Sequence, residues 1–406
     1  MKKIHRAWFV LIGCCLIQSA VLGIIFNCRG IFFDPICSEL SFSLADLTSF
    51  GLYFGVACCV SMPLVPKVFE KENAHVILLF LSIVLGLSLY CCSFFNSLWQ
   101  WYAIGVLQGL LCAFVYAIAA TTVINNWFNE KKGLALGIAG ACPALTGAIM
   151  NPIASKIIYK YGWRIAYKTL GILFLLMIVP AYLFLVRINP EKIGQKAYGE
   201  KTVAINQGGV GIKETLKSYS FYFLFVIAGI AACITCYTQL LPKYGKTLQF
   251  ISNPSVLASL SMIGNCTCKF FIGDIADKKG VKVACLLSTL FLMIGFLLLS
   301  FNNMYAVYCG SFFIGVSTSV TIIVIPLLIR SFFGNKEYAK KMSYISMSSN
   351  LFNSLGITIY GFVIDKNGYS FSLIMSLIMS LFILLITLLA IKIRKKEIHE
   401  QTCWKH

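Results

Sequence analysis

Apolar runs of bilayer length recur from one end of this 406-residue chain to the other. A helix that crosses the hydrocarbon core of a membrane needs roughly 20 mostly apolar residues. About a dozen such helices with short connections account for nearly the whole chain, which leaves no room for a separate soluble domain. Only 12% of the residues are charged, whereas a soluble domain usually has about 25%. The pattern predicts an all-α integral membrane protein.

We expect twelve transmembrane helices, the first of which is retained in the protein rather than removed as a signal peptide. They are predicted at residues 7–33, 44–65, 74–94, 98–124, 133–158, 165–186, 219–241, 255–272, 281–301, 304–332, 339–364 and 369–391. A basic, glycine-containing stretch separates the sixth span from the seventh. We therefore predict an N-terminal six-helix bundle (1–187), a cytoplasmic linker (188–218), and a C-terminal six-helix bundle with a short basic tail (219–406).

The two halves carry similar motifs about 206 residues apart. Trp127-Phe128 in the first half corresponds to Phe332-Phe333 in the second, and Gly162-Trp163-Arg164 corresponds to Asn367-Gly368-Tyr369. Parallel repeats of this kind predict two pseudo-symmetric bundles, related by an axis along the membrane normal, with a central cavity between them.

The basic residues predict the orientation in the membrane. The net charge is +19, but the charges lie in short clusters between apolar runs, which favours a lipid bilayer over nucleic acid as the partner. With a cytoplasmic N-terminus, 25 of the 34 Lys and Arg lie inside and seven lie outside. We therefore predict both termini in the cytoplasm and the protein in the plasma (inner) membrane. The connection between spans five and six, with Lys156, Lys160, Arg164 and Lys168, departs from this rule.

Several other classes of protein are disfavoured. Most of the 17 cysteines lie inside apolar runs, where they pack as small hydrophobic residues. The Cys233/Cys236 and Cys266/Cys268 pairs lack the second ligand pair that a zinc site needs, so we expect no metal or cofactor. A phosphate-binding loop is absent, which disfavours a primary pump. We see no intramembrane machinery for an enzyme, and the two-half organisation disfavours a channel or receptor.

The segment Gly273-Asp274-Ile275-Ala276-Asp277-Lys278-Lys279-Gly280-Val281-Lys282 joins spans eight and nine. It resembles the loop motif G-x-x-x-D-R/K-x-G-x-R/K of the major facilitator superfamily, which implies that fold and alternating-access transport. We interpret the loop as a conformational latch. Gly273 would let two helices approach, Asp277 and Lys278 would supply charges, and Gly280 would support a tight turn.

A second stretch runs from Trp127-Phe128-Asn129-Glu130-Lys131-Lys132 to Gly140, followed by Asn151-Pro152 and Tyr161-Gly162-Trp163-Arg164. It resembles the oxalate/formate antiporter family and its relatives, the monocarboxylate transporters. Asn189-Pro190-Glu191-Lys192-Ile193-Gly194 is similar to the start of that family's linker. Within this stretch, Gly133, Gly137 and Gly140 place small residues on one helix face, which predicts close helix packing.

Two basic residues, Arg29 and Lys269, fall within predicted spans. Ionisable groups inside a membrane are costly and usually functional. The resemblance implies a base at the Lys269 position that binds the substrate carboxylate, and a second base in helix one, for which Arg29 is the candidate. A guanidinium can hold a carboxylate through two hydrogen bonds, and an ammonium offers a point charge. Snorkelling to the membrane surface, or ion pairing, is the alternative interpretation for both.

Acidic residues are predicted only in loops, termini or span edges, with Asp34 and Glu39 in the first outer loop. Proton-coupled monocarboxylate relatives use an aspartate one turn before the base of span eight, where this chain has Asn265. Asparagine does not titrate, which favours anion exchange or facilitated movement over proton symport, although Asp34 could still carry a proton at the rim. Oxalate-specific relatives carry a second base in span eleven, and the comparable region here, residues 344–353, has none.

The sequence thus predicts a monomeric secondary transporter, not an enzyme, for a small organic anion such as a monocarboxylate or an oxalate-like anion. A proton-coupled monocarboxylate symporter and a drug or metabolite exporter are the alternatives. Polar residues on the spans are candidates for substrate hydrogen bonds, although each could instead join two helices. These candidates are Asn265, Gln108, Tyr116, Tyr237, Gln239 and Asn350.

Overall fold

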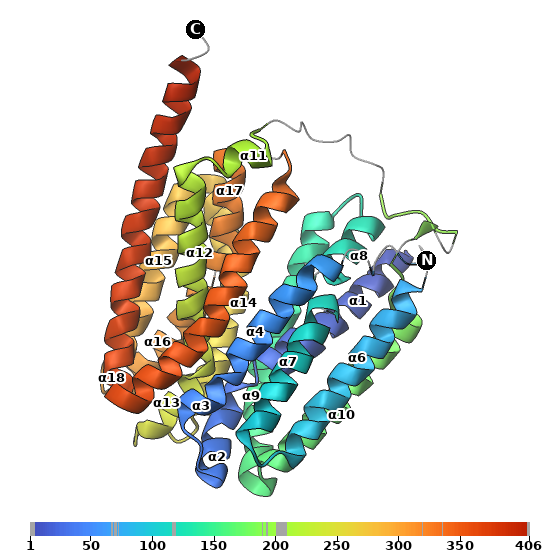
Figure 1. Ribbon diagram of the computed structural model, residues 1–406, viewed down its shortest axis with the longest axis vertical. Coiled ribbons are helices and arrows are strands. Elements are labelled where there is room, and N and C mark those ends of the chain that lie inside the picture. Colours follow the sequence, from blue (N-terminus) through green and yellow to red (C-terminus); the bar gives the residue numbers. More distant parts are fainter. Residues whose placement is uncertain are drawn as a thin grey trace. The chain divides into compact units, whose positions relative to one another are not determined.

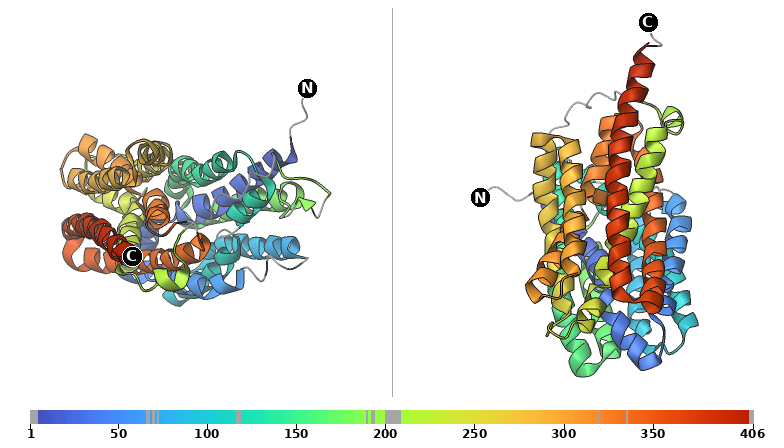
Figure 2. Two further views of the ribbon diagram at one scale, coloured as in Figure 1. Left: turned by 90° about the horizontal axis from the view of Figure 1, so that it is seen from above. Right: turned by 90° about the vertical axis from the view of Figure 1, so that its left-hand side faces the viewer.

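The computed structural model describes residues 5–65, 68, 71, 73–115, 119–188, 190–191, 194–199, 209–318, 320–334 and 336–403. Across these ranges the chain is helical, with two isolated β-bridges and no strand. Eleven described helical segments are long and apolar enough to cross a membrane. The last of them contains Gly368 at φ 79° and ψ 177°, where the chain doubles back (Figures 1 and 2). Counting its two arms separately gives the twelve spans that the sequence predicts.

The chain forms two compact units, the first made of residues 1–203 and 239–263. The predicted division at residues 187 and 219 stays a prediction. The helices of the first unit are α1 (Arg6–Gln18), the π-helix η1 (Ser19–Phe26), α2 (Gly30–Leu40), α3 (Leu44–Thr48), α4 (Phe50–Ser61), η2 (Met62–Leu64), α6 (Ala74–Cys91), η3 (Cys92–Phe94), α7 (Leu98–Val115), α8 (Ala119–Trp127), α9 (Lys132–Tyr161), α10 (Trp163–Pro180), η4 (Ala181–Leu185) and α13 (Leu241–Thr247).

The second unit comprises residues 204–238 and 264–406. Its helices are α11 (Ile212–Thr215), α12 (Tyr219–Thr235), α15 (Val281–Leu299), α16 (Met304–Ser317), the π-helix η7 (Val320–Val324), α17 (Ile325–Phe333) and α18 (Tyr338–Cys403). The short η6 (Cys236–Gln239) and α14 (Ser255–Lys279) each contribute residues to both units.

Two predicted boundaries were wrong. The first span does not end at residue 33, because α2 continues to Leu40 and carries Asp34 and Glu39 on a helix rather than in a loop. The segment after Gly273 is not a loop, because α14 continues to Lys279 and only Gly280 separates it from α15. In both places the helix continues past the end of the apolar run and carries the charged residues that suggested a loop. Hydropathy shows where an apolar stretch ends, but the backbone hydrogen bonds of the helix continue beyond that point.

Large apolar side chains cover the outside of the helices. Val60, Phe80 and Leu176 are 65%, 64% and 66% exposed, and many other Leu, Ile and Phe side chains are similarly open. A soluble protein rarely exposes apolar surface on this scale. A bilayer accommodates such side chains without cost, so the exposed surface agrees with the hydropathy of the spans.

Glycines allow close contact between helices within each unit. In the first unit, a Cβ atom added to Gly109 of α7 would collide with the backbone oxygen of Phe54 on α4. In the second unit, a Cβ added to Gly264 of α14 would collide with the backbone oxygen of Phe312 on α16. These contacts exclude any larger residue, and they are typical of helix packing in membranes, where small residues let backbones approach.

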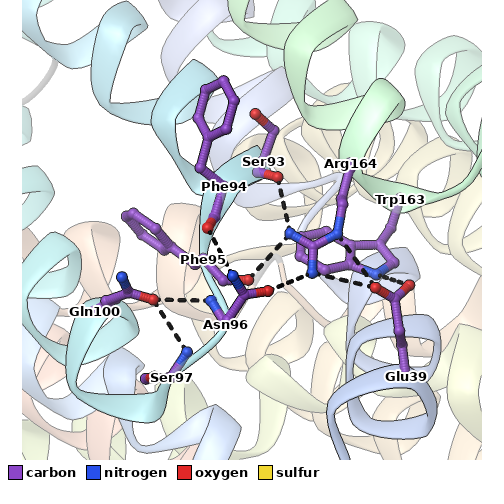
Figure 3. A network of polar contacts seen from close by, with 9 residues as sticks. All are labelled: Glu39, Ser93, Phe94, Phe95, Asn96, Ser97, Gln100, Trp163 and Arg164. Carbon is purple, nitrogen blue, oxygen red and sulfur yellow. Dashed lines mark hydrogen bonds and ion pairs between the residues drawn. The ribbon is translucent and has the colours of Figure 1, made fainter.

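A polar cluster ties the ends of α2, η3 and α10 together (Figure 3). These ends lie at the end of the first unit opposite the start of α1 (Figure 1). Arg164 on α10 donates through Nη1 to the carbonyl oxygens of Ser93 and Phe95, at 3.0 and 3.3 Å, and through Nη2 to Oδ1 of Asn96, at 2.7 Å. Its Nη2 also lies 3.2 Å from Oε1 of Glu39 on α2. Trp163 Nε1 donates to Oε2 of the same carboxylate at 2.7 Å. The cluster therefore gives Arg164, one of the basic residues that departed from the charge rule, a structural role.

The two described ends of the linker are each attached to one unit. In the first unit, the Tyr198 N–H donates to the Trp127 carbonyl and the Asn129 N–H donates to the Tyr198 carbonyl, both at 2.8 Å. In the second unit, the Val210 N–H donates to the Phe333 carbonyl at 2.9 Å, and the Ile212 N–H donates to Oε2 of Glu337 at 2.8 Å. The first attachment also includes the Asn129 side chain, whose Nδ2 donates to the Gly199 carbonyl at 3.3 Å, and ring contacts of Tyr198 with Trp8 and Phe128, whereas the second depends on a carboxylate.

We expect the Arg164 cluster to stabilise the first unit. Arg164→Ala removes hydrogen bonds to two backbone carbonyls and to Asn96 together with the ion pair to Glu39. It should therefore lower the free energy of unfolding by about 1–2 kcal/mol. Glu39→Gln keeps an oxygen acceptor for Trp163 and should cost less. Thermal unfolding of the purified protein in detergent measures both. Lys160→Gln, at an exposed position nearby, is the control, and a loss no larger for Arg164→Ala than for this control would contradict the assignment.

The Glu337 attachment should weaken in acid. The Ile212 N–H, and then Lys340, which lies 2.6 Å from Oε1, hold the pKa of the Glu337 carboxyl below its ordinary value. Because the pKa is lowered, the charged Glu337 carboxylate stabilises the attachment at pH values above the ordinary carboxyl pKa of about 4.3. This stabilisation is lost as the pH falls through the lowered pKa. Amide hydrogen exchange of residues 209–216, corrected for intrinsic rates, should therefore increase in that acidic window.

Residues 194–199 provide the control for this measurement, because their hydrogen bonds with Trp127 and Asn129 involve amide groups that do not titrate and should not respond in the same window. Glu337→Ala should exchange fast at 209–216 at every pH. Equal pH dependence in the wild type and in Glu337→Ala would show that the carboxylate does not hold the segment.

Candidate functional site

Arg29 follows an irregular part of the first span. The π-helix η1 ends with the Asn27 N–H donating to the Leu22 carbonyl at 3.0 Å, and a turn over residues 27–29 precedes α2. Asn27 is held by α9, because its Nδ2 donates to the Pro143 carbonyl at 3.0 Å and its carbonyl accepts from Asn151 Nδ2 at 3.2 Å. Single π-helical turns interrupt helices most often at functional sites. Because α2 then continues for 11 residues, Arg29 lies well inside the span.

The guanidinium of Arg29 is buried among aromatic rings. The residue is 8% exposed, and Cζ lies 4.5 Å from the ring centre of Phe50, 5.2 Å from Phe54 and 5.3 Å from Phe26. Four ion pairs occur in the described part of the chain, and none includes Arg29. Its Nη2 is buried and makes no hydrogen bond to any residue that the structure describes. Cation–π contacts thus stabilise the charge in part, but no anion among the described residues neutralises it.

A small cavity of about 20 Å³ adjoins this guanidinium. A single water molecule needs roughly 10–15 Å³ by the same measure, so the space accepts a group of only a few atoms. Gln108, which is 3% exposed, lines it and donates through Nε2 to Ser88 Oγ at 3.2 Å. Trp101 also lines it, and its buried Nε1 has no hydrogen-bond acceptor. The cavity therefore combines a cation and polar groups inside an apolar wall.

Other buried cations of the chain have acceptors. Lys341, which is 0% exposed, donates to the Phe333 carbonyl at 3.0 Å. Arg394, which is 5% exposed, donates through Nε and Nη2 to the Phe332 carbonyl, at 3.0 and 2.6 Å. Both lie at the C-terminal end of α17, where free carbonyls favour positive charge. Their burial has a structural cause, and no such cause accounts for Arg29.

Two further predicted residues belong to the first unit. A Cβ on Gly30 would collide with the backbone oxygen of Gln239, so Gln239 packs directly against the residue after Arg29. Its side-chain Oε1 is buried and has no hydrogen-bond donor. Tyr116 lies outside the described residues. Gln108 is thus the predicted residue that the structure brings to the Arg29 cavity, and Gln239 lies against the adjoining backbone.

The remaining predicted binding residues lie in the second unit. Lys269 is half-buried on α14, and Asn265, one turn earlier, has a buried Oδ1 without a hydrogen-bond donor. Asn350 is half-buried on α18. Tyr237 is 0% exposed, and its hydroxyl lies 3.3 Å from Ser372 Oγ, so it packs inside the unit. The binding roles of these four residues stay predictions.

The predicted packing glycines have open space around them. A Cβ added to Gly133, Gly137 or Gly140 would meet no atom of the described residues within 4 Å, so the described helices make no close contact there and the packing role stays a prediction. The close contacts on α9 come from other positions. A Cβ on Gly147 would lie 2.8 Å from the Asn27 side chain, and one on Gly23 of η1 would lie 2.7 Å from Thr146. These glycines hold the turn before Arg29, and nothing in the sequence pattern distinguishes them.

The predicted latch has a mixed outcome. Gly280 has φ 88°, as a tight turn requires, and Lys278 lies 2.8 Å from Oδ2 of Asp274, one helical turn away. A Cβ on Gly273 would meet no atom of the described residues within 4 Å, so no described helix approaches it closely. The Asp277 side chain lies outside the described part of the structure. A latch function stays a prediction.

Sequence reasoning missed the aromatic wall around Arg29. Phe50 and Phe54 lie one turn apart on the start of α4, and Tyr167 lines the cavity from α10. The Phe50/Phe54 spacing is a signal that the sequence contains, but aromatic residues at helical spacing are equally typical of an ordinary core. Only the tertiary structure brings them to the cation.

Comparisons with known proteins identify relatives of this chain. It is 28% identical over 43% of its length to the riboflavin transporter RibJ of Trypanosoma brucei brucei, covering 31% of that protein. It is 23% identical over 67% of its length to the oxalate:formate antiporter of Oxalobacter formigenes, covering 64% of it. It is 26% identical over 42% of its length to monocarboxylate transporter 12 of Homo sapiens, covering 35% of it. The matches thus span less than two thirds of these relatives.

The fold also matches solved transporter structures. The crystal structure of the nucleoside transporter NupG aligns with a TM-score of 0.73 at 14% identity, covering 96% of this chain and 99% of the other. At this identity the match concerns the fold alone. The family model of the Major Facilitator Superfamily matches residues 15–257 and 251–405. The chain therefore belongs to the major facilitator superfamily and is a multi-pass membrane protein.

Proposed function

We propose that the protein transports small organic anions by alternating access, and that Arg29 binds the carboxylate of the substrate. The observation that carries this proposal is a buried guanidinium that has no acidic partner among the described residues and whose Nη2 is unbonded beside a cavity. A charge inside a membrane protein is expensive unless it is paired or hydrogen-bonded. An entering carboxylate supplies both.

The surroundings of Arg29 favour an anion over other substrates. A guanidinium binds a carboxylate through two parallel hydrogen bonds, which fixes its orientation as well as its charge. The apolar wall lowers the local dielectric and so strengthens the attraction. The same positive charge repels cations, and the small volume of the cavity favours a compact head group. Lys269 is proposed as the second cation that contacts the substrate.

Two curated relatives have names that fit this chemistry, the oxalate:formate antiporter and monocarboxylate transporter 12. The riboflavin transporter has a larger substrate by name. We propose a carboxylate of the size of formate, lactate, pyruvate or oxalate because of the small cavity at Arg29.

We propose exchange of one anion for another rather than proton symport. A carrier that returns empty must move an uncompensated buried cation through the transition between its two states, which is costly. A carrier that returns with a second anion avoids this cost. Asn265 stands where proton-coupled relatives have an aspartate, and its amide does not titrate. A proton symporter that uses Asp34, or an exporter of drugs or metabolites, is the alternative.

The proposed setting is the plasma (inner) membrane, with both termini in the cytoplasm and a monomer as the functional unit. The unequal distribution of Lys and Arg supports this orientation. The start of α1, the α8–α9 connection and the linker would then lie at the cytoplasmic side, and the Arg164 cluster at the outer side.

The function can be tested by counterflow in proteoliposomes with formate, lactate, pyruvate and oxalate. Arg29→Gln should lower anion exchange at least about tenfold, because it removes a charge-assisted hydrogen-bond pair, and Arg29→Lys should keep part of the activity. Lys269→Gln should also lower anion exchange. Arg6→Gln removes one charge from the exposed start of the same span and should transport normally.

The outcomes separate the alternatives. Uptake that requires a proton gradient but does not require an internal anion would contradict the exchange mechanism and support proton symport. Transport of apolar drugs that survives Arg29→Gln and Lys269→Gln would favour an exporter. The anion assignment fails if none of the four carboxylates is exchanged.

A stability measurement tests whether Arg29 is present for binding or for folding. Arg29→Met removes an unneutralised buried charge and keeps an apolar stem, so the free energy of unfolding should stay equal or rise by about 1 kcal/mol, although cation–π contacts are lost. Anion exchange should disappear in the same variant. Thermal unfolding in detergent, with Arg394→Met as the comparison, checks this. A structural role for Arg29 predicts instead that both variants are similarly destabilised.

A further inference from the structure

A second, larger pocket lies on the other side of α2. Its volume is about 730 Å³, compared with about 20 Å³ beside Arg29. α2 supplies Asp34 to its lining, the C-terminal part of α9 supplies Lys156, and α13 supplies Lys243 and Lys246. All of these elements belong to the first unit. The pocket is at the end of the unit that also carries the Arg164 cluster.

The pocket has excess positive charge. Lys246 Nζ lies 2.6 Å from Oδ2 of Asp34, so these two charges neutralise each other. The other two lysines, Lys156 and Lys243, form none of the ion pairs in the described part of the chain. Asp34 is the acidic residue of the lining, and its pairing removes the group that would repel an anion. Two unneutralised ammonium groups therefore face one concave space.

The walls of the pocket strengthen this charge. Ile31 and Ile158 line it together with prolines, and low-dielectric walls focus the field of nearby charges into a cleft. Ser155 and Asn253 add hydrogen-bonding groups, and the Ser255 hydroxyl, which donates to Asn253 Oδ1 at 2.7 Å, orients that amide. Solvent and salt would screen most of the attraction between an anion and lysines on an open surface, whereas lysines around a cleft retain more of this attraction.

The two spaces share one helix. Gly30 and Asp34 line the larger pocket, whereas Arg29 and Phe32 line the smaller cavity. Arg29 and Asp34 are five residues apart, which is about 7.5 Å along a helix. The two spaces are therefore lined by neighbouring turns of the same segment of chain.

We propose that the larger pocket is a second anion-binding site, which holds carboxylate-bearing substrates between Lys156 and Lys243 before they reach Arg29. Its substrate class rests on the function proposed above, but its anion binding does not. The site raises the local concentration of the anion and so lowers the KM of transport, without taking part in the step that moves the substrate. It also accounts for lysines at the predicted outer side, where the charge rule disfavours them.

Transport kinetics in proteoliposomes provide the first test, with radiolabelled pyruvate and oxalate as probes. The double variant Lys156→Gln/Lys243→Gln should raise KM about three- to tenfold, leave the maximal rate within about twofold, and weaken the dependence of KM on ionic strength. Lys156→Arg/Lys243→Arg should restore the wild-type values, which a merely structural role for the two lysines does not predict. Lys160→Gln removes a neighbouring exposed charge outside the pocket and should change neither quantity.

Equilibrium binding to the purified protein separates this proposal from the Arg29 assignment. In the Arg29→Gln background, weak binding of pyruvate and oxalate at low salt should remain, and adding Lys156→Gln/Lys243→Gln should abolish it. Unchanged KM and salt dependence in the double lysine variant, with no residual binding in Arg29→Gln, would overturn the second site and leave the transport function intact. Loss of transport for all carboxylates with residual binding preserved would instead overturn the function and retain the site.

Discussion

The absence of hydrogen-bonding partners in the hydrocarbon core is the constraint from which this architecture follows. Each backbone N–H and C=O that crosses a membrane must find its partner within the protein, and a helix meets this demand inside a single segment. The described chain accordingly has helices and two isolated bridges, with one bridge at the attached end of the linker in each unit. Because lipid tails are as apolar as leucine, moving apolar side chains from lipid into a helix interface contributes little to the free energy of helix association. Close backbone contacts at residues such as Gly109 and Gly264 provide the packing.

Charged side chains lie mainly where spans end, and several of them have clear structural partners. Arg164 binds backbone carbonyls at the end of η3, and Lys341 and Arg394 bind the carbonyls at the end of α17. Free carbonyls at helix C-termini are natural acceptors for cations. Against this background Arg29 stands out for physical reasons. It lies within a span beside a π-helical turn, its neighbours are aromatic, and the described part of its unit supplies no anion. An unneutralised cation in such a place is a cost to folding, which the binding of an anion, as we propose, would offset.

The two pockets around α2 suggest how one helix can serve selection and transport together. The larger one has lysines around an open volume, and in our proposal it attracts anions over a distance with little demand on their shape. The smaller one has a guanidinium beside a confined space, which in our proposal binds the compact carboxylate group. A weak, accessible site followed by a strong, confined one would allow fast loading without trapping the substrate, since salt screens the outer attraction more than the inner one.

The sequence by itself determined the number of spans, the family and the presence of two cations within spans, because hydropathy, short motifs and charge are local properties. It also indicated Gln108 as a candidate for substrate hydrogen bonds, although its place beside Arg29 followed only from the structure. Helix ends were less accessible to sequence reasoning. The apolar run stops at Phe33, yet backbone hydrogen bonds carry α2 on to Leu40, and this extension is what moves Arg29 inward from the end of its span.

Only the tertiary structure decided which residues meet. It assigned close contact to Gly23 and Gly147 rather than to the regularly spaced Gly133, Gly137 and Gly140, because close approach depends on where a neighbouring helix crosses and not on spacing along one helix. It paired Asp34 with Lys246 across 212 positions of sequence, and it surrounded Arg29 with Phe50 and Phe54. The sequence determines that a basic residue such as Arg29 lies within a membrane span. The packing of helices that are distant in sequence determines whether its charge contacts a partner or a cavity.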